Sequence, residues 1–191
     1  MTRLDQQMAF LMEAEKLRQI LRATPIGDGS RHENSAEHSW HLALFAAVLR
    51  EHAPEGVQID RVIRMLLIHD IVEIDAGDVP IYAQTADGQA ETEAAEQAAA
   101  ERLFGLLPDD QATDFKSLWE EFEAAQSPDA VFAKSLDRFQ PPNLNLASGG
   151  GSWKDYNVTF DVLDQRVGKP IRRGAPALWD WIAPKIRAVL G

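Results

Sequence analysis

Apolar residues recur every three or four positions along nearly the whole chain, and a sustained alternation of apolar and polar residues occurs nowhere. The first spacing is that of one face of an α-helix, whereas alternation is the signature of a half-buried strand. We therefore predict an all-α protein, a helical bundle in which helices bury their apolar faces against one another. The predicted helices cover residues 4–22, a segment starting near Ser35, and residues 59–74, 91–107, 110–125, 128–139, 155–167 and 175–190.

Polar and helix-breaking residues set the ends of these helices. Asn34, followed three positions later by Glu37, resembles a capping box and predicts a helix start just after it. Pro141-Pro142 is expected to end a helix, because proline cannot donate the backbone hydrogen bond that a helix interior needs. The glycine-rich residues 148–152 are expected to form a flexible loop. No repeat or long linker divides the chain, so residues 1–191 are expected to form a single domain.

The composition excludes several classes of function. The 191 residues include 30 Asp and Glu against 19 Lys and Arg, giving a formal net charge of -11, which argues against binding a nucleic acid polymer or an anionic membrane. No stretch is long and apolar enough to span a bilayer and the N-terminus lacks the pattern of a secretory signal, so we expect a cytoplasmic location. The chain has no cysteine. Any metal must therefore bind nitrogen and oxygen.

The segment HDIVEIDAGD, residues 69–78, places a histidine and several carboxylates directly after an apolar run that should be buried. Buried charges are costly unless they are paired or bound to a metal. On a helix, His69 and Glu73 are four positions apart and Asp70 and Glu73 are three apart, so their side chains share a neighbourhood. Asp78 follows Gly77, where the chain can turn back. These side chains are therefore candidates for one polar site.

Two other segments can supply further metal ligands. His38 and His41 lie in the first turns of the helix that starts near Ser35, and Asp137 lies in an otherwise apolar stretch. Imidazole nitrogen with carboxylate oxygen is a ligand set that Mn, Co, Ni, Fe and Zn accept without thiolate. The alternatives are ordinary: His69-Asp70 as a surface pair at a helix end, His41 as a core histidine, and Asp137 as a helix cap or an ion-pair partner.

The order His38, then His69-Asp70, then Asp137 resembles the HD-domain metal-dependent phosphohydrolases, and within them the YfbR-like branch of 5'-deoxynucleotidases. That branch has an Arg, an Asn and then Glu-His-Ser, as in residues 31–39 here, and a His-Asp followed by Glu and Gly-Asp, as in residues 69–78. The motifs span about residues 31–138. Residues 141–151 have no clear counterpart in that branch, so they are candidates to border the substrate pocket.

The resemblance implies a role for each matching residue. The implied metal ligands are His38, His69, Asp70 and Asp137, with Glu73 and Asp78 acting at the reaction centre. A bound divalent ion would lower the pKa of a water and polarise a phosphoryl oxygen. Glu73 could move a proton, and Asp78 could orient the water or help Glu73 hold a second ion. We expect Arg31 to contact the substrate phosphate, with Arg18 or Arg22 as second choices.

The resemblance favours a phosphomonoesterase acting on a small nucleotide, most plausibly a deoxyribonucleoside 5'-monophosphate. The cofactor is expected to be a divalent ion, with Mn, Co, Mg, Zn, Ni and Fe all acceptable. Two alternatives stay open: the same site cleaving another phosphate ester, such as a nucleoside triphosphate, guanosine tetraphosphate or cyclic nucleotide, or a helical module that binds metal or nucleotide without catalysis. We also expect a homodimer formed through the amphipathic first and last helices, the latter carrying Trp179 and Trp181.

Overall fold

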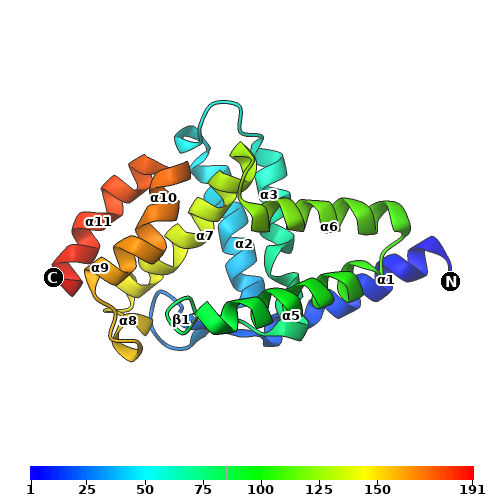
Figure 1. Cartoon of the computed structure of the whole chain (residues 1–191), viewed down its shortest axis with the longest axis horizontal. Helices are drawn as coiled ribbons and strands as arrows, with labels where there is room; N and C mark the ends of the chain where they lie inside the picture. The colour runs from blue at the N-terminus through cyan, green and yellow to red at the C-terminus, as the bar shows by residue number, and fades with distance from the viewer. Residues whose placement is uncertain (85) are drawn as a thin grey trace.

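The computed structural model describes residues 1–84 and 86–191, and most of them are helical, which confirms the all-α fold class (Figure 1). The α-helices are α1 (Arg3–Ala14), α2 (Ser35–Val48), α3 (Ile59–Ile68), α4 (Glu73–Ala76), α5 (Ala86–Phe104), α6 (Asp109–Ala124), α7 (Pro128–Ala147), α8 (Ser152–Asp155), α9 (Phe160–Leu163), α10 (Lys169–Gly174) and α11 (Pro176–Leu190). The shorter turns are the 3-10 helices η1 (Glu15–Gln19), η2 (Arg50–His52) and η3 (His69–Val72) and the π-helical turn η4 (Asp164–Gly168).

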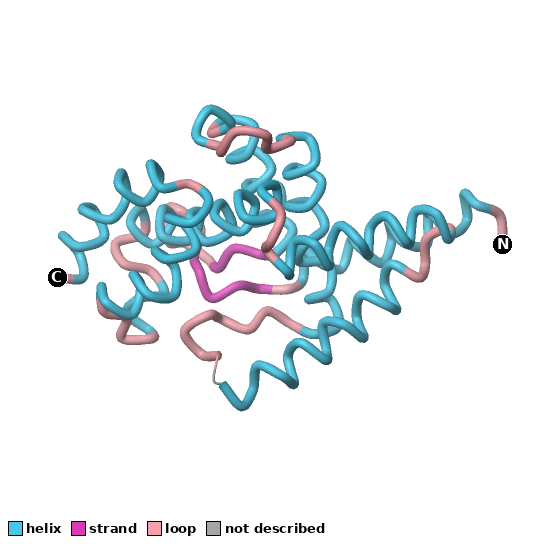
Figure 2. The backbone as a smooth tube through the Cα atoms, turned by 45° about the horizontal axis from the view of Figure 1, so that its top comes forward, coloured by secondary structure: helices cyan, strands magenta, loops and turns pink. Residues whose placement is uncertain are grey.

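A small antiparallel sheet was not predicted. Its strands are β1 (Leu21–Pro25) and β2 (His32–Asn34), and they pair with Leu21 opposite Asn34 and Pro25 opposite His32. The predicted helix 4–22 was therefore wrong beyond Gln19, where η1 ends. Strands this short leave too few residues for an alternating pattern to be recognised. Figure 2 shows the two strands running side by side through the middle of the molecule, enclosed by helices.

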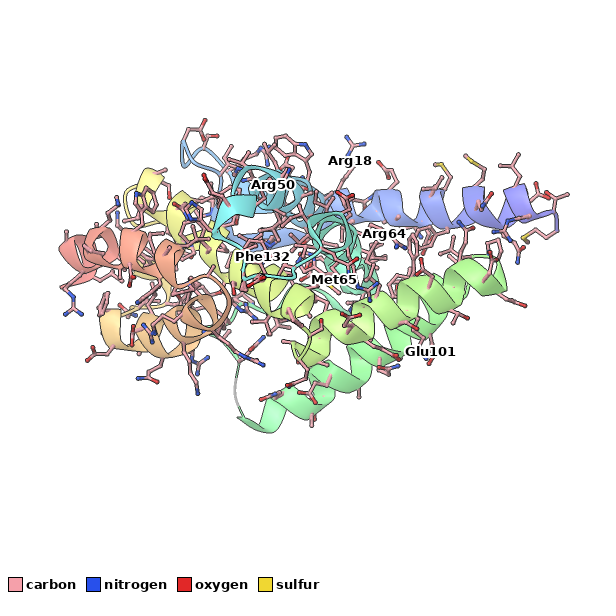
Figure 3. The ribbon with its side chains drawn as sticks, turned by 90° about the horizontal axis from the view of Figure 1, so that it is seen from above. Arg18, Arg50, Arg64, Met65, Glu101 and Phe132 are labelled. Carbon is pink, nitrogen blue, oxygen red and sulfur yellow. The ribbon has the colours of Figure 1, made fainter. Side chains whose placement is uncertain are left out.

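The core is organised around α7, which packs against α2, α3, α6, α10 and α11. Figure 1 shows α7 crossing between α10 on one side and α2 and α3 on the other, with the two termini at opposite ends of the long axis. Met65 of α3 and Phe132 of α7 are fully buried, and Figure 3 shows both near the centre of the molecule. Burial of such side chains contributes about 1.5 to 3 kcal/mol each.

The predicted end of the helix at Phe139 was wrong, because α7 continues through Pro141 and Pro142 to Ala147. Each internal proline removes a backbone hydrogen bond and costs about 3 kcal/mol. Packing has to offset this cost, and Pro142 and the following Asn145 are indeed buried on this part of the helix. Tertiary contacts, which the local sequence does not reveal, override the usual helix-breaking effect of proline here.

The predicted start of α2 agrees with the structure, whereas the predicted helix 155–167 does not. The capping box is confirmed: the Asn34 side chain accepts a hydrogen bond from the Glu37 backbone N–H at 2.9 Å, and the Glu37 carboxylate accepts one from the Asn34 backbone. The predicted helix 155–167 was wrong as a single element: α8 ends at Asp155, and α9 and η4 follow only after residues 156–159. Among the described residues, no helix combines the length and the apolar character that crossing a bilayer requires.

The last helix bears on the expected dimer. Trp179 is buried, with 5% of its surface exposed, so it belongs to the core, whereas Trp181 is 54% exposed. Of the two tryptophans, only Trp181 is placed to contact another molecule. The homodimer stays a prediction.

We expect Gly174→Ala to lower the free energy of unfolding by about 1 to 3 kcal/mol, the usual cost of overpacking a tight contact. A Cβ at Gly174 would lie 2.6 Å from the backbone oxygen of Val131, and the backbone of α7 cannot easily move. Gly27→Ala is the matched control, since its Cβ would meet only ordinary contacts at 3.8 Å. Urea unfolding of both variants measures the difference, and equal stabilities would contradict the expected clash.

Candidate metal centre and its cavity

Three of the predicted ligands converge in the structure. His38 of α2, His69 of η3 and Asp137 of α7 are all buried, and one ligand atom from each lies within 4.8 Å of the others. His38 Nε2 is 3.1 Å from Asp137 Oδ1, and His69 Nε2 is 3.8 Å from the same oxygen. The packing of α2 and α3 against α7, with η3 directly following α3, therefore joins residues separated by about a hundred positions in the chain.

The predicted helix 59–74 is not one continuous α-helix, because it is interrupted at the polar residues. The α-helix ends at Ile68, and His69 and Asp70 lie in the tighter turn η3 before α4 starts at Glu73. Asp70 Oδ1 lies 2.9 Å from His69 Nε2, so Asp70 adjoins the cluster. Gly77, at φ 77°, ends α4 with a conformation that favours glycine, and the chain then turns back. Asp78 reaches the site in this way.

Outer hydrogen bonds orient both histidine rings. His69 Nδ1 lies 2.9 Å from the carbonyl oxygen of Leu66, and His38 Nδ1 lies 3.1 Å from Gln140 Oε1 and 3.3 Å from Glu33 Oε2. Since all these partners accept hydrogen bonds, Nδ1 carries the proton in the neutral ring and Nε2 keeps its lone pair. Both Nε2 atoms face Asp137. This is how metal-binding histidines are usually held.

The buried polar atoms fit a divalent cation. His69 Nε2 is buried and, within the described residues, makes no hydrogen bond, although Asp70 Oδ1 is near. Burying such an atom without a partner is unfavourable, and coordination would satisfy it. Two imidazole nitrogens with carboxylate oxygen are also a donor set that several divalent ions accept. The residues present therefore match the requirements of a metal centre.

The pKa values show how much negative charge gathers at this point. Burial lowers the pKa of His69, but the carboxylates of Asp70 and Asp137 outweigh it and raise the pKa to about 10. Burial raises the pKa of Asp137, but Arg138, His38 and His69 bring it well below its usual value. In the metal-free protein these carboxylates favour a proton on His69, and a bound metal cation would replace that proton and use the Nε2 lone pair.

Glu73 and Asp78, the predicted reaction-centre residues, meet around Arg22 of β1. Arg22 Nη1 lies 2.8 Å from Asp70 Oδ2, 3.4 Å from Asp78 Oδ1 and 3.6 Å from Glu73 Oε1. Glu73 Oε2 accepts a hydrogen bond from Ser35 Oγ at 2.5 Å. Burial and the charge of Asp70 raise the pKa of Glu73 well above its usual value, and they also raise the pKa of Asp78.

A cavity of about 320 Å³ opens at this cluster, within the size range of small-ligand pockets. Its polar lining at the metal centre consists of Arg22, His69, Asp70, Glu73, Asp78 and Asp137. Arg138 also lines the cavity, with its Nε 3.8 Å from Asp137 Oδ2. The cavity therefore joins a metal-type donor set to carboxylates and to two guanidinium groups.

The other arginines considered from the sequence lie elsewhere. Arg31 forms two hydrogen bonds to the Glu37 carboxylate, at 2.7 and 2.8 Å, on the exposed side of the capping box, and it is not among the residues that line the cavity. Arg18 pairs with Glu15 and is 70% exposed, and Figure 3 shows it pointing outward. Of the three candidates, Arg22 is the one that reaches the cavity.

Two buried residues that support the candidate ligands, Gln140 and Glu33, were not predicted from the sequence. Gln140 Nε2 donates to Glu33 Oε1 at 2.7 Å and lies 3.2 Å from His41 Nδ1, so Gln140 links two histidines and a buried carboxylate. Its position three residues after Asp137 on one helix was the available signal. Glu33 lies in the unpredicted strand β2, and no periodic pattern could have identified it.

Comparisons with known proteins find relatives that bear the name 5'-deoxynucleotidase. A 5'-deoxynucleotidase of Homo sapiens is 32% identical over 110 residues, which cover 56% of this chain and 50% of that protein. A 5'-deoxynucleotidase of Pectobacterium atrosepticum is 27% identical over 174 residues, covering 87% of this chain and 83% of that protein. In the human, bovine and mouse relatives, the matched segment spans about half of the relative's length.

A solved structure extends the likeness to the whole fold. The crystal structure of a "Predicted metal-dependent phosphohydrolase" from Magnetospirillum magnetotacticum superposes with a TM-score of 0.90 at 48% sequence identity, covering 98% of this chain and 95% of the other. Residues 14–179 match the HD domain family, a range that holds the metal centre, Arg22 and the cavity wall from α7. The chain therefore belongs to the HD domain family.

Proposed function

We propose that the protein is a metal-dependent phosphohydrolase that releases phosphate from deoxyribonucleoside 5'-monophosphates. The observation that carries the proposal is the convergence of His38, His69 and Asp137 beside a cavity that Asp70, Glu73 and the largely buried Arg22 also line. The relatives that bear the name 5'-deoxynucleotidase support the choice of substrate, and the Magnetospirillum structure supports the reaction class.

His38, His69 and Asp137 would hold the divalent ion, and Asp70, adjacent to His69, is proposed as the fourth ligand. When bound, Mn, Co, Mg, Zn, Ni or Fe supplies Lewis acidity, which lowers the pKa of a water and polarises a phosphoryl oxygen. The protein positions this chemistry with Gln140 and Leu66, whose oxygens fix the two imidazole rings. Such outer partners maintain ligand orientation.

Glu73 is proposed as the proton donor to the leaving 5'-oxygen. Its raised pKa favours a protonated carboxyl, and the hydrogen bond from Ser35 Oγ fixes the position of the group. A positioned general acid contributes about 100- to 10,000-fold to a rate. Asp78, whose Oδ1 lies 3.4 Å from Arg22 Nη1, is proposed to orient the attacking water.

Arg22 is proposed as the phosphate contact in place of Arg31. The Arg22 side chain is 13% exposed, it lines the cavity, and its buried Nε makes no hydrogen bond within the described residues. A phosphate oxygen would accept this N–H, and guanidinium groups bind phosphate in a fixed two-point geometry. Arg31 is already engaged by Glu37 at the surface.

We expect His69→Ala and Asp137→Ala each to reduce phosphate release by more than about 100-fold, since even an outer partner of a metal ligand typically costs 10- to 100-fold. The assay measures inorganic phosphate from a panel of deoxyribonucleoside and ribonucleoside mono- and triphosphates with Mn, Co, Mg and Zn. His52→Ala, an exposed histidine outside this cavity, is the control and should keep full activity. Triphosphate cleavage would redirect the proposal to another ester, and an inactive wild type with every metal would reject it.

We expect Gln140→Ala to weaken Mn²⁺ binding by about 10- to 100-fold, because His38 loses the oxygen that orients its Nε2. Calorimetric titration of the metal-free protein measures the dissociation constant. Gln111→Ala is the control. The Gln111 side chain, on α6, accepts a hydrogen bond from Gln7 of α1 away from the metal centre, so its removal should leave metal binding unchanged. Equal affinities in the two variants would show that Gln140 has no orienting role.

A further inference from the structure

The cavity follows one face of α7 away from the metal centre. Lys134, Asp137, Arg138, Pro141 and Asn145 line it, at the three- and four-residue spacing of a helix face. A helix rises about 1.5 Å per residue, so Asn145 lies about 12 Å along the axis from Asp137, whereas Lys134 lies about 4.5 Å away in the other direction. Measured along α7, the C-terminal arm of the cavity is therefore the longer one.

The lining of this longer arm is mainly apolar. It is formed by Tyr82, Pro141, Pro142, Trp153 and Val167. Trp153 is 2% exposed and held firmly in the core, and burial raises the pKa of Tyr82 to about 12, so the Tyr82 hydroxyl stays protonated. Rings and proline faces of this kind suit a planar heteroaromatic ligand.

The shorter arm offers a different surface. Glu93, Glu96 and Glu123 lie there, and burial and the charge of Glu123 raise the pKa of Glu96 to about 7. The one aromatic ring at this end is Phe122 among the described lining residues, and Lys134 Nζ sits 3.9 Å from its centroid. That ring face is already covered, so a planar ligand finds its apolar surface in the longer arm.

Asn145 supplies a fixed hydrogen-bond donor to the longer arm. Asn145 is 2% exposed, and its Oδ1 accepts hydrogen bonds from Ser152 N at 2.9 Å and from Ser152 Oγ at 3.2 Å. These bonds fix which end of the amide is oxygen. Within the described residues no hydrogen bond uses Asn145 Nδ2, so two N–H donors are left for a ligand in the cavity.

The glycine-rich turn is shaped to hold Asn145 in this way. Gly150 N donates to the Asn145 backbone oxygen at 2.7 Å, and a Cβ at Gly151 would lie 2.1 Å from Asn145 Oδ1. Gly151 also has φ +41°, so both space and backbone conformation require glycine there. The segment 148–152 was expected to be a flexible loop, but its hydrogen bonds make it the support of a buried amide.

We propose that Pro141, Pro142, Asn145, Ser152 and Trp153, with Tyr82, form the nucleobase subsite. The base lies against the wall made by Tyr82, the prolines and Trp153, and Asn145 Nδ2 donates to an acceptor on its edge. This inference rests on the proposed function, since it assumes that a nucleotide phosphate lies at Asp137. A phosphate at that point places the sugar and base farther along α7, toward Asn145.

The test compares dTMP with 2-deoxyribose 5-phosphate, which carries a hydroxyl group in place of the base. We expect Asn145→Ala to lower kcat/KM for dTMP by about 10-fold, the upper size of a neutral hydrogen bond, and to leave kcat/KM for 2-deoxyribose 5-phosphate unchanged. Tyr82→Ala, in a separate segment, should show the same selective loss and serves if Asn145→Ala does not fold. Asn143→Ala is the matched control, because Asn143 bonds the Phe139 carbonyl and does not line this cavity.

Equal losses on the two substrates in both variants would overturn the subsite, as would a wild-type enzyme that does not prefer dTMP. If the wild type hydrolyses neither compound, the proposed phosphatase function fails, and the subsite is judged by thymidine binding to the metal-free protein. Calorimetry should then show binding that Asn145→Ala and Tyr82→Ala weaken and Asn143→Ala does not. Absence of thymidine binding would reject the subsite by itself.

Discussion

The buried carboxylates at the junction of η3, α4 and α7 set the conditions that the surrounding structure has to satisfy. Asp70, Asp137 and Glu73 are each less than a tenth exposed, and Asp78 lies beside them. Isolated buried charges of this kind would destabilise the fold by several kcal/mol each. They are balanced by Arg22, by the two histidines and by the Ser35 hydroxyl. The same balance leaves a place for a cation and a donor for a phosphate, so charge compensation and the proposed chemistry use the same side chains.

Helix α7 connects this charged cluster to the rest of the protein. One part of its surface packs Phe132 and Leu136 into the core, another holds Asp137 and Gln140 at the metal centre, and its C-terminal half carries Asn145. Its neighbours α2, α3, α6, α10 and α11 fix its position from several sides. Rigid support of this kind is what a site needs to hold its geometry. Pro141 and Pro142 contribute to this support, because they give α7 a rigid, apolar wall where it extends beyond the metal centre.

The sequence predicted the parts of the fold and site that depend on local spacing. His69, Asp70 and Glu73 are close in the chain, so any helical arrangement brings them together, and the Asn34 capping box needs only a three-residue interval. The convergence of His38 and Asp137 on His69 could be expected from the resemblance to the HD-domain phosphohydrolases, but not from periodicity. The β1–β2 pair, the helix through Pro141 and the choice between Arg22 and Arg31 depend on tertiary contacts. Arg22 reaches the site because it lies on a strand, whereas the periodicity had placed it at the end of a helix.

The protein is acidic overall but places Arg22 at the candidate site, and this combination is consistent with a small substrate. A net charge of -11 repels a nucleic acid polymer, whose binding depends on many basic contacts along a surface. A single phosphate requires much less: a largely buried guanidinium whose Nε–H has no hydrogen-bond partner in the described part of the chain, where the low dielectric strengthens each interaction. Arg138 adds a second positive charge on the cavity wall. Two guanidinium groups on the cavity wall of an acidic protein suit a single phosphate group better than a long polyanion, which favours a mononucleotide over a strand.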